Sequence, residues 1–151
     1  MSLEQEFELI RRVPIFSTTD PSMQKLLAFS SDRLTYEGGQ LMFSAGDAPD
    51  SAYIVMEGEV DITVPTPKGQ LLVNTLLRND VIGEIGIFGD VPRTATATAR
   101  TRVDVLRISR DVFINVIRSN PDAAIALVRI LADRLAKTTA QLRRMAAENS
   151  K

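Results

Sequence analysis

Short apolar segments that alternate with polar residues fill the middle of the chain, from Arg33 to Ser109. The clearest segment runs from Glu59 to Val64. Its apolar side chains, Val60, Ile62 and Val64, should face inward and its carboxylates outward, because successive side chains of a strand point to opposite faces. Turn-forming residues separate about eight such segments, a spacing typical of a closed barrel or a jelly roll. We therefore predict a mainly β fold with flanking helices, built on an eight-stranded jelly-roll-type β-barrel (a double-stranded β-helix) with room for one small ligand.

Helical patterns precede and follow this region. Apolar residues recur at helical spacing from Leu3 to Arg12, and Asp20 before Pro21 predicts the start of a second short helix. Between these helices, Val13 to Phe16 is expected to form an apolar plug. Ser109 is the candidate N-cap of a further helix, because its hydroxyl can accept a hydrogen bond from the first turn.

The length of 151 residues suits one domain with a single core and one extra helix. We expect a single domain over residues 1–151, with N-terminal helices in residues 1–32, the β-barrel in 33–109 and C-terminal helices in 110–148. The sequence contains no internal repeat or low-complexity linker that would argue for another boundary.

The last helix, Asp122 to about Ala147, is the longest element that the pattern predicts. About 25 helical residues span roughly 37 Å, which is more than a barrel of this size can cover. Apolar residues recur along the helix with the alternating four–three spacing of a coiled coil, with one polar interruption. These seam residues are Ala124, Val128, Leu131, Leu135, Thr138, Leu142 and Met145. We expect a homodimer through this helix, the alternative being a helix that packs on its own barrel.

Neither cysteine nor histidine occurs in the chain. Disulfides, iron–sulfur clusters and cysteine nucleophiles are therefore excluded, and the commonest metal ligand and general base are missing. Two carboxylate pairs remain as candidates, Asp47 with Asp50 and Glu57 with Glu59. They fall at turns or on an outward strand face, where solvated carboxylates are the ordinary explanation. We expect a binding protein with no metal and no cofactor, rather than an enzyme.

The formal net charge of −1 gives no general electrostatic attraction to nucleic acid or to an anionic membrane. No apolar run approaches the roughly 18 residues that span a bilayer. The N-terminus is too acidic for a signal peptide. We expect a cytoplasmic protein that, as this chain alone, binds neither nucleic acid nor membrane.

An acid and a base, nine positions apart, bracket a glycine-rich segment within Val81 to Ala99. The acid is Glu84, directly after Gly83, and the base is Arg93. Such a stretch suits a ligand that is anionic at one end and donates a hydroxyl at the other, because an arginine fork donates to phosphate oxygens whereas an ionised carboxylate only accepts. The alternative is a structural ion pair, with the glycines serving tight turns.

This stretch resembles the phosphate-binding cassette of the cyclic nucleotide-binding domain, a family that includes bacterial catabolite activators, regulatory subunits of cAMP-dependent kinase and several ion channels. The match is carried by Gly83 to Ile87 and by Pro92 to Ala95, with the plug at Val13 to Phe16 in its expected place. The resemblance implies that Glu84 accepts a hydrogen bond from the ribose 2′-hydroxyl. It also implies that Arg93 pairs with the cyclic phosphate.

The same resemblance implies roles for the sequence neighbours of Glu84 and Arg93. Gly83 allows the backbone to approach the ligand closely, and the N–H of Ile85 points at the anion. Thr94 and the N–H of Ala95 complete the phosphate shell.

The last helix carries a second match, since Arg134 to Thr139 resembles the segment with which catabolite activators cover the purine. On that analogy Thr138 and Thr139, with the option of one from each subunit, hydrogen-bond the adenine edge. Arg134 would approach the acid of the cassette. In the alternative, Thr138 only occupies the seam and Arg134 is solvated. Thr94 could also meet the amino group of a syn guanine, whereas Thr138 and Thr139 favour adenine. The expected ligand is cAMP, ahead of cGMP.

Together these patterns indicate a regulatory module that senses a cyclic nucleotide and relays binding through its C-terminal helix. Catabolite activators continue into a helix-turn-helix unit, which a chain ending at Lys151 is expected to lack. Two alternatives stay open. One is the effector-domain fragment of a catabolite-activator-like transcription regulator, and the other is a dimerisation module that keeps the barrel but senses nothing.

Overall fold

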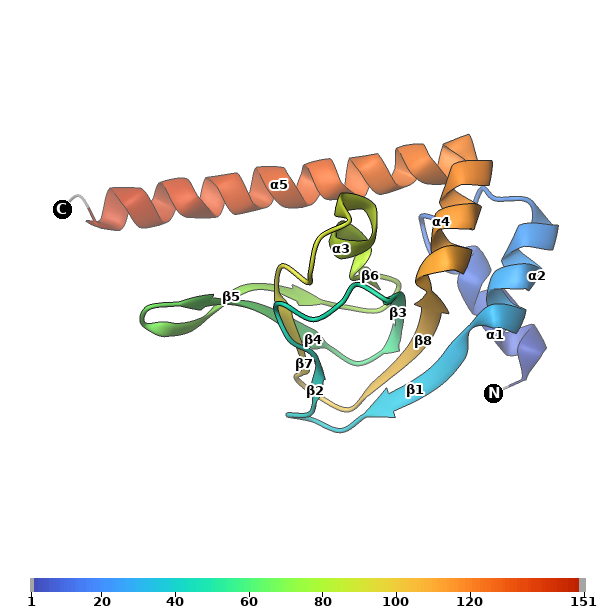
Figure 1. The fold of residues 1–151 in the computed structure, drawn as a ribbon, viewed down its shortest axis with the longest axis horizontal. Coiled ribbons are helices and arrows are strands. Elements are labelled where there is room, and N and C mark those ends of the chain that lie inside the picture. The colour runs from blue at the N-terminus through green and yellow to red at the C-terminus, as the bar shows by residue number, and fades with distance from the viewer. Residues whose placement is uncertain (1, 150–151) are drawn as a thin grey trace.

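Eight antiparallel strands form two four-stranded sheets in the computed structural model, which describes residues 2–149 (Figure 1). The first sheet has the order β1-β8-β3-β6: β1 (Asp32–Tyr36), β8 (Val103–Ser109), β3 (Ser51–Glu57) and β6 (Val81–Ile82). The second sheet has the order β2-β7-β4-β5: β2 (Leu41–Phe43), β7 (Thr96–Ala99), β4 (Val60–Thr66) and β5 (Gly69–Leu76). The predicted jelly-roll fold is confirmed. Within the described residues the sheets stay separate, so the body is a two-sheet sandwich rather than a closed barrel.

Strand β3 lies between two apolar layers of the domain. Tyr53 and Val55 belong to the layer between the two sheets, whereas Ile54 and Met56 belong to the layer between the first sheet and the helices. Successive side chains of a strand point to opposite faces, so a strand covered on both faces needs a continuous apolar run. The run from Ala52 to Met56 meets that need, and every residue in it is buried.

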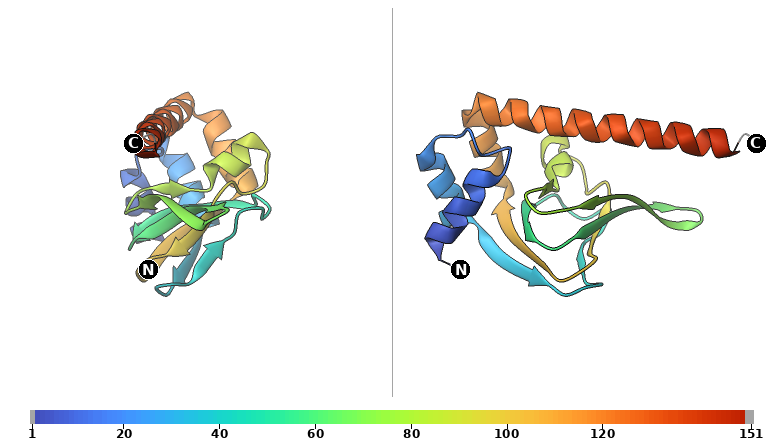
Figure 2. Two further views of the ribbon diagram at one scale, coloured as in Figure 1. Left: turned by 90° about the vertical axis from the view of Figure 1, so that its left-hand side faces the viewer. Right: turned by 180° about the vertical axis from the view of Figure 1, so that it is seen from behind.

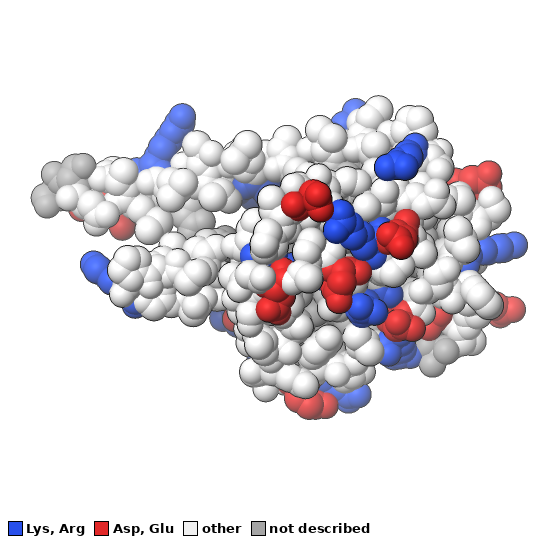
Figure 3. Space-filling view, in the orientation of Figure 1, with Lys and Arg blue, Asp and Glu red and all other residues white. Residues whose placement is uncertain are grey.

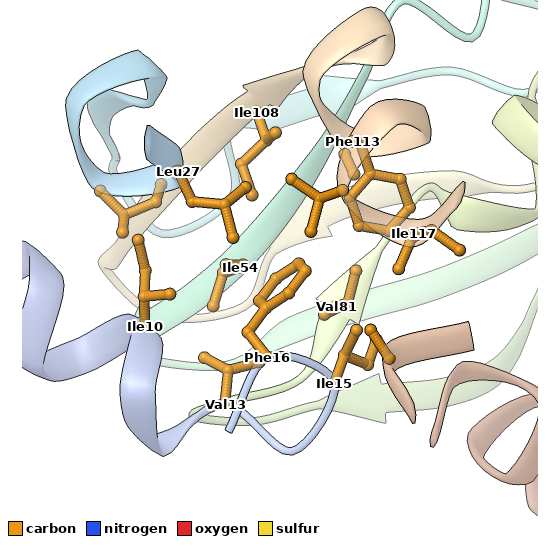
Figure 4. Close-up of a cluster of buried hydrophobic side chains, with 14 of the residues drawn as sticks. Ile10, Val13, Ile15, Phe16, Leu27, Ile54, Val81, Ile108, Phe113 and Ile117 are labelled. Atoms are coloured by element: carbon orange, nitrogen blue, oxygen red, sulfur yellow. The ribbon is translucent and has the colours of Figure 1, made fainter. Parts of the chain in front are cut away.

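The plug is the centre of the layer on the helix side (Figure 4). Val13, Ile15 and Phe16 have no exposed surface, so the predicted role of this segment is confirmed. Phe16 meets Phe113 edge to face, with the ring centroids 6.1 Å apart, and both lie in one cluster with Ile54. This layer fixes the helices to the outer face of the first sheet.

Three helices that pack on the first sheet contribute further to this layer. They are α1 (Leu3–Arg12), α2 (Pro21–Ser30) and α4 (Arg110–Ser119). Asp20 caps α2 by accepting a hydrogen bond from the N–H of Ser22 at 3.1 Å, and Ser109 caps α4 by accepting from the N–H of Val112 at 3.4 Å. Both predicted caps are therefore confirmed, and each satisfies a backbone donor that the first helical turn leaves free.

Helix α5 (Pro121–Asn149) is a single long helix, as predicted. Its 29 residues span roughly 43 Å. The first turns pack on the domain through the buried side chains of Ala123 and Leu127. Beyond them α5 passes over α3 (Glu84–Gly89) and projects away from the other helices, alongside the β4–β5 hairpin (Figures 1 and 2).

The seam residues divide between the two packings considered for this helix. Ala124 and Leu131 pack against the core of their own domain. By contrast, the side chains of Val128, Leu135 and Leu142 are exposed to 64%, 68% and 58%. Their spacing of seven residues places these three on one side of the helix. They form an uncovered apolar stripe along α5.

Charged side chains of both signs are interspersed on the face shown in Figure 3. The mixture of signs leaves this face without a large field of one sign. Several charged side chains of the domain pair directly, such as Arg110 with Asp90 at 2.9 Å and Arg107 with Asp50 at 3.4 Å. In the described part of the chain, no helix has both the length and the apolar content that a membrane crossing requires.

Candidate functional site

The glycine-rich stretch folds as the end of β6, a tight turn and the short helix α3. Gly83 forms the turn with a φ of +94°, in the left-handed region that glycine enters without Cβ strain. A Cβ at this position would lie 2.3 Å from Nη1 of Arg93 and 3.1 Å from the carbonyl oxygen of Ser51. Glycine therefore lets the Arg93 guanidinium lie directly against the backbone.

Glu84 begins α3 with a side chain that is buried inside the domain, the residue being 1% exposed. Its Oε1 accepts a hydrogen bond from Nη1 of Arg134 on α5. Nη2 of Arg134 donates to the carbonyl oxygen of Val81 at 2.8 Å, so this arginine fastens α5 to both α3 and β6. The other carboxylate oxygen, Oε2 of Glu84, is buried and has no hydrogen-bond partner among the described residues.

Burial raises the pKa of Glu84 above its ordinary value, because removal from water disfavours the charged form. The guanidinium of Arg134, the backbone N–H of Glu84 itself and the charge of Arg93 all lower this pKa, but burial outweighs them. A further hydrogen-bond donor that reached Oε2 would stabilise the ionised carboxylate.

Arg93 lies just before β7 and is 4% exposed. Its backbone is fixed to the β2–β3 loop, because its N–H donates to the carbonyl of Asp47 and its carbonyl accepts from the N–H of Gly46, both at 2.8 Å. The guanidinium donates from Nη1 to the carbonyl oxygen of Gly83 at 3.1 Å and from Nη2 to that of Ser51 at 2.6 Å. Its Nε is buried and has no partner within residues 2–149.

The positive charge of Arg93 is balanced only in part. The carboxylate of Asp50 lies 3.5 Å from Nη2, and the side chain of Asp50 is itself 64% exposed. The ring of Phe43 lies over the guanidinium, with its centroid 4.3 Å from Cζ. Burial lowers the pKa of Arg93, and the carboxylates of Asp50, Asp47 and Glu84 act in the opposite direction. A guanidinium remains charged even so, and an anion that reached it would gain a desolvated partner.

One cavity brings the acid and the base together. It holds about 410 Å³ of space between atoms, its open mouth included. Seven predicted site residues line it: Gly83, Glu84, Ile85, Arg93, Thr94, Ala95 and Arg134. The apolar part of the wall comes from Phe43, Ile62, Leu76 and Ile82. The arrangement can hold a small molecule with an anionic group, a hydroxyl and an apolar surface.

Two predicted site residues lie outside this cavity lining. Thr138 is exposed and Thr139 is half-buried, and both lie on α5 about one turn beyond Arg134. Of the predicted site residues on α5, only Arg134 lines the cavity.

Three residues around Arg93 were missed as site residues by sequence reasoning. Ser51 contributes a backbone carbonyl, which every residue carries, so no side-chain pattern could reveal it. Asp50 reads as one more solvated carboxylate at a turn. Phe43 reads as an ordinary strand residue, because only the pairing of β2 with β7 brings it to Arg93. Over residues 2–149, no group of three or more acidic side chains is placed to hold a metal ion.

A sequence profile of the cyclic nucleotide-binding domain matches residues 33–120 of this chain. That range contains both sheets apart from one residue, together with Glu84 and Arg93. The chain belongs to the cyclic nucleotide-binding domain family. The family expected from the resemblance is thereby confirmed.

Relatives of this cyclic nucleotide-binding domain are regulatory proteins. The CRP-like cAMP-activated global transcriptional regulator of Mycobacterium tuberculosis is 32% identical over 136 residues, 89% of this chain and 61% of that protein. A cAMP-dependent protein kinase regulatory subunit from Yarrowia lipolytica is 33% identical over 104 residues, 69% of this chain and 27% of that protein. The chain therefore spans less than two thirds of the length of either relative.

A solved structure supports the same family. The N-terminal domain of a transcriptional regulator from Streptomyces coelicolor A3(2) superposes with a TM-score of 0.66 and 34% sequence identity. The superposition covers 86% of this chain and 94% of that one. The likeness thus extends over nearly the whole of that N-terminal domain.

Proposed function

We propose that residues 1–151 form a cytoplasmic, non-catalytic sensor module that binds cAMP, ahead of cGMP, in the cavity beside α3. The observation that carries the proposal is a pair of buried atoms without partners, Oε2 of Glu84 and Nε of Arg93. The first accepts hydrogen bonds when ionised and the second only donates. An unpaired buried polar atom costs free energy until a partner reaches it. The pair therefore favours a ligand that carries both a hydroxyl donor and an anionic acceptor.

A cyclic nucleotide carries these two groups on one ribose ring. In the proposed complex, Glu84 accepts a hydrogen bond from the 2′-hydroxyl and Arg93 donates to the cyclic phosphate. The N–H groups of Ile85 and Ala95 and the hydroxyl of Thr94 complete the phosphate shell from the same cavity wall. A carboxylate beside the phosphate would repel it, so the separate placement of acid and base also sets the orientation of the ligand.

The purine is proposed to lie toward α5. Thr138 and Thr139 would hydrogen-bond the adenine edge once α5 shifts or once a second copy supplies them. The exposed stripe of Val128, Leu135 and Leu142 supports a homodimer through α5, since it leaves a heptad-spaced apolar surface for another helix.

Binding is proposed to reach α5 through Arg134. A ribose hydroxyl gives a second hydrogen-bond donor to the carboxylate that now holds Arg134, and Arg134 also holds α5 to the carbonyl of Val81. A ligand shifts such an equilibrium only by binding one arrangement better than the other. The relay therefore depends on a difference in affinity between the two positions of α5.

Isothermal titration calorimetry with cAMP and cGMP tests the binding proposal. We expect a saturable heat for the wild-type chain, with the tighter binding for cAMP. Arg93→Ala should abolish the heat, whereas Arg100→Ala, which removes an exposed arginine after β7, should leave it unchanged. Folded wild-type protein that gives no heat at millimolar nucleotide would overturn the proposal in favour of a module that only dimerises.

The similarity to the mycobacterial regulator over 89% of the chain favours a wider proposal, that this module is the effector part of a transcription regulator. A chimera in which α5 continues into the DNA-binding part of that regulator tests it. We expect operator binding that increases when cAMP is added. Operator binding that ignores cAMP, in a chimera that binds the nucleotide, would contradict a relay through α5.

A further inference from the structure

We propose that Phe43 is a positioning residue that holds the guanidinium of Arg93 ready for a phosphate without occupying any of its N–H donors. The proposal rests on the proposed function, since it concerns how the same cavity receives a cyclic nucleotide. The aromatic ring of Phe43 acts on the ligand through Arg93. No charge or hydrogen-bond pattern in the sequence reveals this residue.

The need for such a residue comes from how Arg93 is surrounded. It is buried, and the carboxylate within reach of it, that of Asp50, lies at 3.5 Å on a side chain that is largely exposed to water. The buried carboxylate of the cavity, Glu84, is engaged by Arg134. Two backbone carbonyl oxygens accept from the Nη atoms of Arg93, but they are neutral. A desolvated cation without a buried carboxylate of its own is costly to maintain before the ligand arrives.

The ring of Phe43 lowers the free-energy cost of the buried cation in a way that a second carboxylate could not. A carboxylate at this position would stabilise the cation by accepting from its N–H groups, and it would then compete with and repel the incoming phosphate. The face of an aromatic ring stabilises a cation through its quadrupole, most strongly when both are desolvated. The centroid of the Phe43 ring is 4.3 Å from Cζ of Arg93, and Nε keeps no hydrogen-bond partner in the described chain. The charge is stabilised while a donor stays open.

Local structure places the ring. The pairing of β2 with β7 shifts between Leu41, which lies opposite Thr98, and Phe43, which lies opposite Ala97. Such irregularities bend a strand and redirect its side chains. Phe43 also stacks on Tyr53 of β3, with the centroids 5.9 Å apart and the rings inclined by 24°. Because Tyr53 is buried between the sheets, it supports the Phe43 ring from the domain interior.

Three variants of the full chain test the inference. Phe43→Leu keeps an apolar side chain but removes the ring, Phe43→Tyr keeps the ring, and Phe29→Leu makes the same change at an exposed position on α2. We expect Phe43→Leu to weaken cAMP binding about tenfold in calorimetry. Phe43→Tyr should bind within about threefold of the wild type, and Phe29→Leu should bind as the wild type does.

A second readout separates positioning from simple filling of the cavity. In ¹⁵N NMR spectra of the ligand-free protein, the Nε–H signal of Arg93 is assigned by its absence in Arg93→Lys. We expect this signal to be resolved in the wild type, in Phe43→Tyr and in Phe29→Leu. It should be lost to solvent exchange in Phe43→Leu, because the guanidinium is then no longer held in one place.

The outcomes are distinct. Wild-type cAMP affinity in Phe43→Leu would overturn the inference. Weakened binding with an unchanged Arg93 signal would also overturn it, since Phe43 would then only fill the cavity wall. A wild-type chain that binds no cAMP would instead refute the proposed function, and the Arg93 signal in the ligand-free variants would still decide whether Phe43 positions the guanidinium.

Discussion

Glu84 and Arg93 are buried charges that are balanced in different ways. Glu84 has a direct cationic partner in Arg134, whereas Arg93 relies on two carbonyl oxygens, an exposed carboxylate and an aromatic ring. A buried ion is strongly affected when its partner is removed. Glu84 should therefore respond to pH and to changes in Arg134, and Arg93 should respond to changes in the shape of its surroundings.

Affinity for cAMP should fall as the pH is lowered through the raised pKa of Glu84. Because this pKa lies above its ordinary value, Glu84 is protonated at a pH at which an exposed glutamate is still ionised. A protonated carboxyl is a weaker acceptor for the ribose hydroxyl, so binding weakens as the pH falls. Calorimetric titrations between about pH 7.5 and about pH 5 measure this. The residual affinity of Glu84→Gln should not vary with pH, and a wild-type profile equally flat would contradict the prediction.

Gly83→Ala should lower the stability of the protein and abolish cAMP binding. The left-handed φ becomes strained, and the new Cβ displaces the Arg93 guanidinium that now lies 2.3 Å from its position. We expect the free energy of unfolding to fall by about 1–3 kcal/mol in urea denaturation. Gly39→Ala is the matched control, with a φ of +88° and open space around the added Cβ. Gly39→Ala should lose stability through backbone strain alone and keep its binding of cAMP. Equal cAMP binding by Gly83→Ala and Gly39→Ala would contradict the prediction.

At the scale of elements, α3 and α5 are connected by the pair of Glu84 and Arg134. The first turns of α5 are held by apolar packing at Ala123 and Leu127, and Arg134 adds a polar attachment about two turns further along. The attachment reaches α3 and β6 at once, so it joins the C-terminal helix to the wall of the ligand cavity.

Arg134→Met should destabilise the protein by about 2–4 kcal/mol near neutral pH, because the buried carboxyl group of Glu84 must then either stay ionised without a partner or take up a proton. The deficit relative to the wild type should shrink as the pH falls, since a protonated Glu84 no longer needs a cation. Urea denaturation at several pH values measures both effects. Lys137→Met breaks the exposed pair with Asp133 on the same helix and should change stability by no more than about 0.5 kcal/mol. If the loss in the free energy of unfolding did not change with pH, Glu84 would not be its cause.

For the whole molecule, local signals in the sequence predicted the elements but not how they pair. Alternation from Glu59 to Val64 predicted β4, and Asp20 and Ser109 predicted two helix starts, because each signal depends on neighbouring residues. The separation into two sheets depends on hydrogen bonds between distant segments, which no local pattern contains. Strand β6, Val81–Ile82, is too short to show alternation.

The residues of the candidate site could likewise be predicted only in part. Gly83, Glu84 and Arg93 could be predicted because their side-chain chemistry and spacing are visible along the chain. The carbonyl of Ser51 and the ring of Phe43 could not, because they reach Arg93 only through strand pairing. The heptad spacing of α5 was also visible in the sequence. It does not determine whether the domain itself or another helix covers each seam residue. Ala124 and Leu131 in fact face the domain's own core.

Leu135→Lys should convert the proposed homodimer into a monomer, since it places a charge at the centre of the exposed stripe on α5. Sedimentation velocity over a range of protein concentrations measures the change. Ala136→Lys adds the same charge at the adjacent exposed position, outside the stripe, and should leave the dimer intact. A wild-type chain that sediments as a monomer at every concentration would refute the homodimer.

Helix α5 is attached to the domain near its N-terminal end and extends freely beyond it. Its packing on the domain core extends to Leu131, and about 27 Å of helix continues from there to Asn149. A tilt of about 10° at Leu131 would therefore move the far end by about 5 Å. Arg134 is a further attachment roughly 5 Å beyond Leu131, so the loss of its contact with Glu84 would leave the rest of the helix unsupported. A small change at the cavity wall would then produce a displacement about as large as a side chain at the far end of α5.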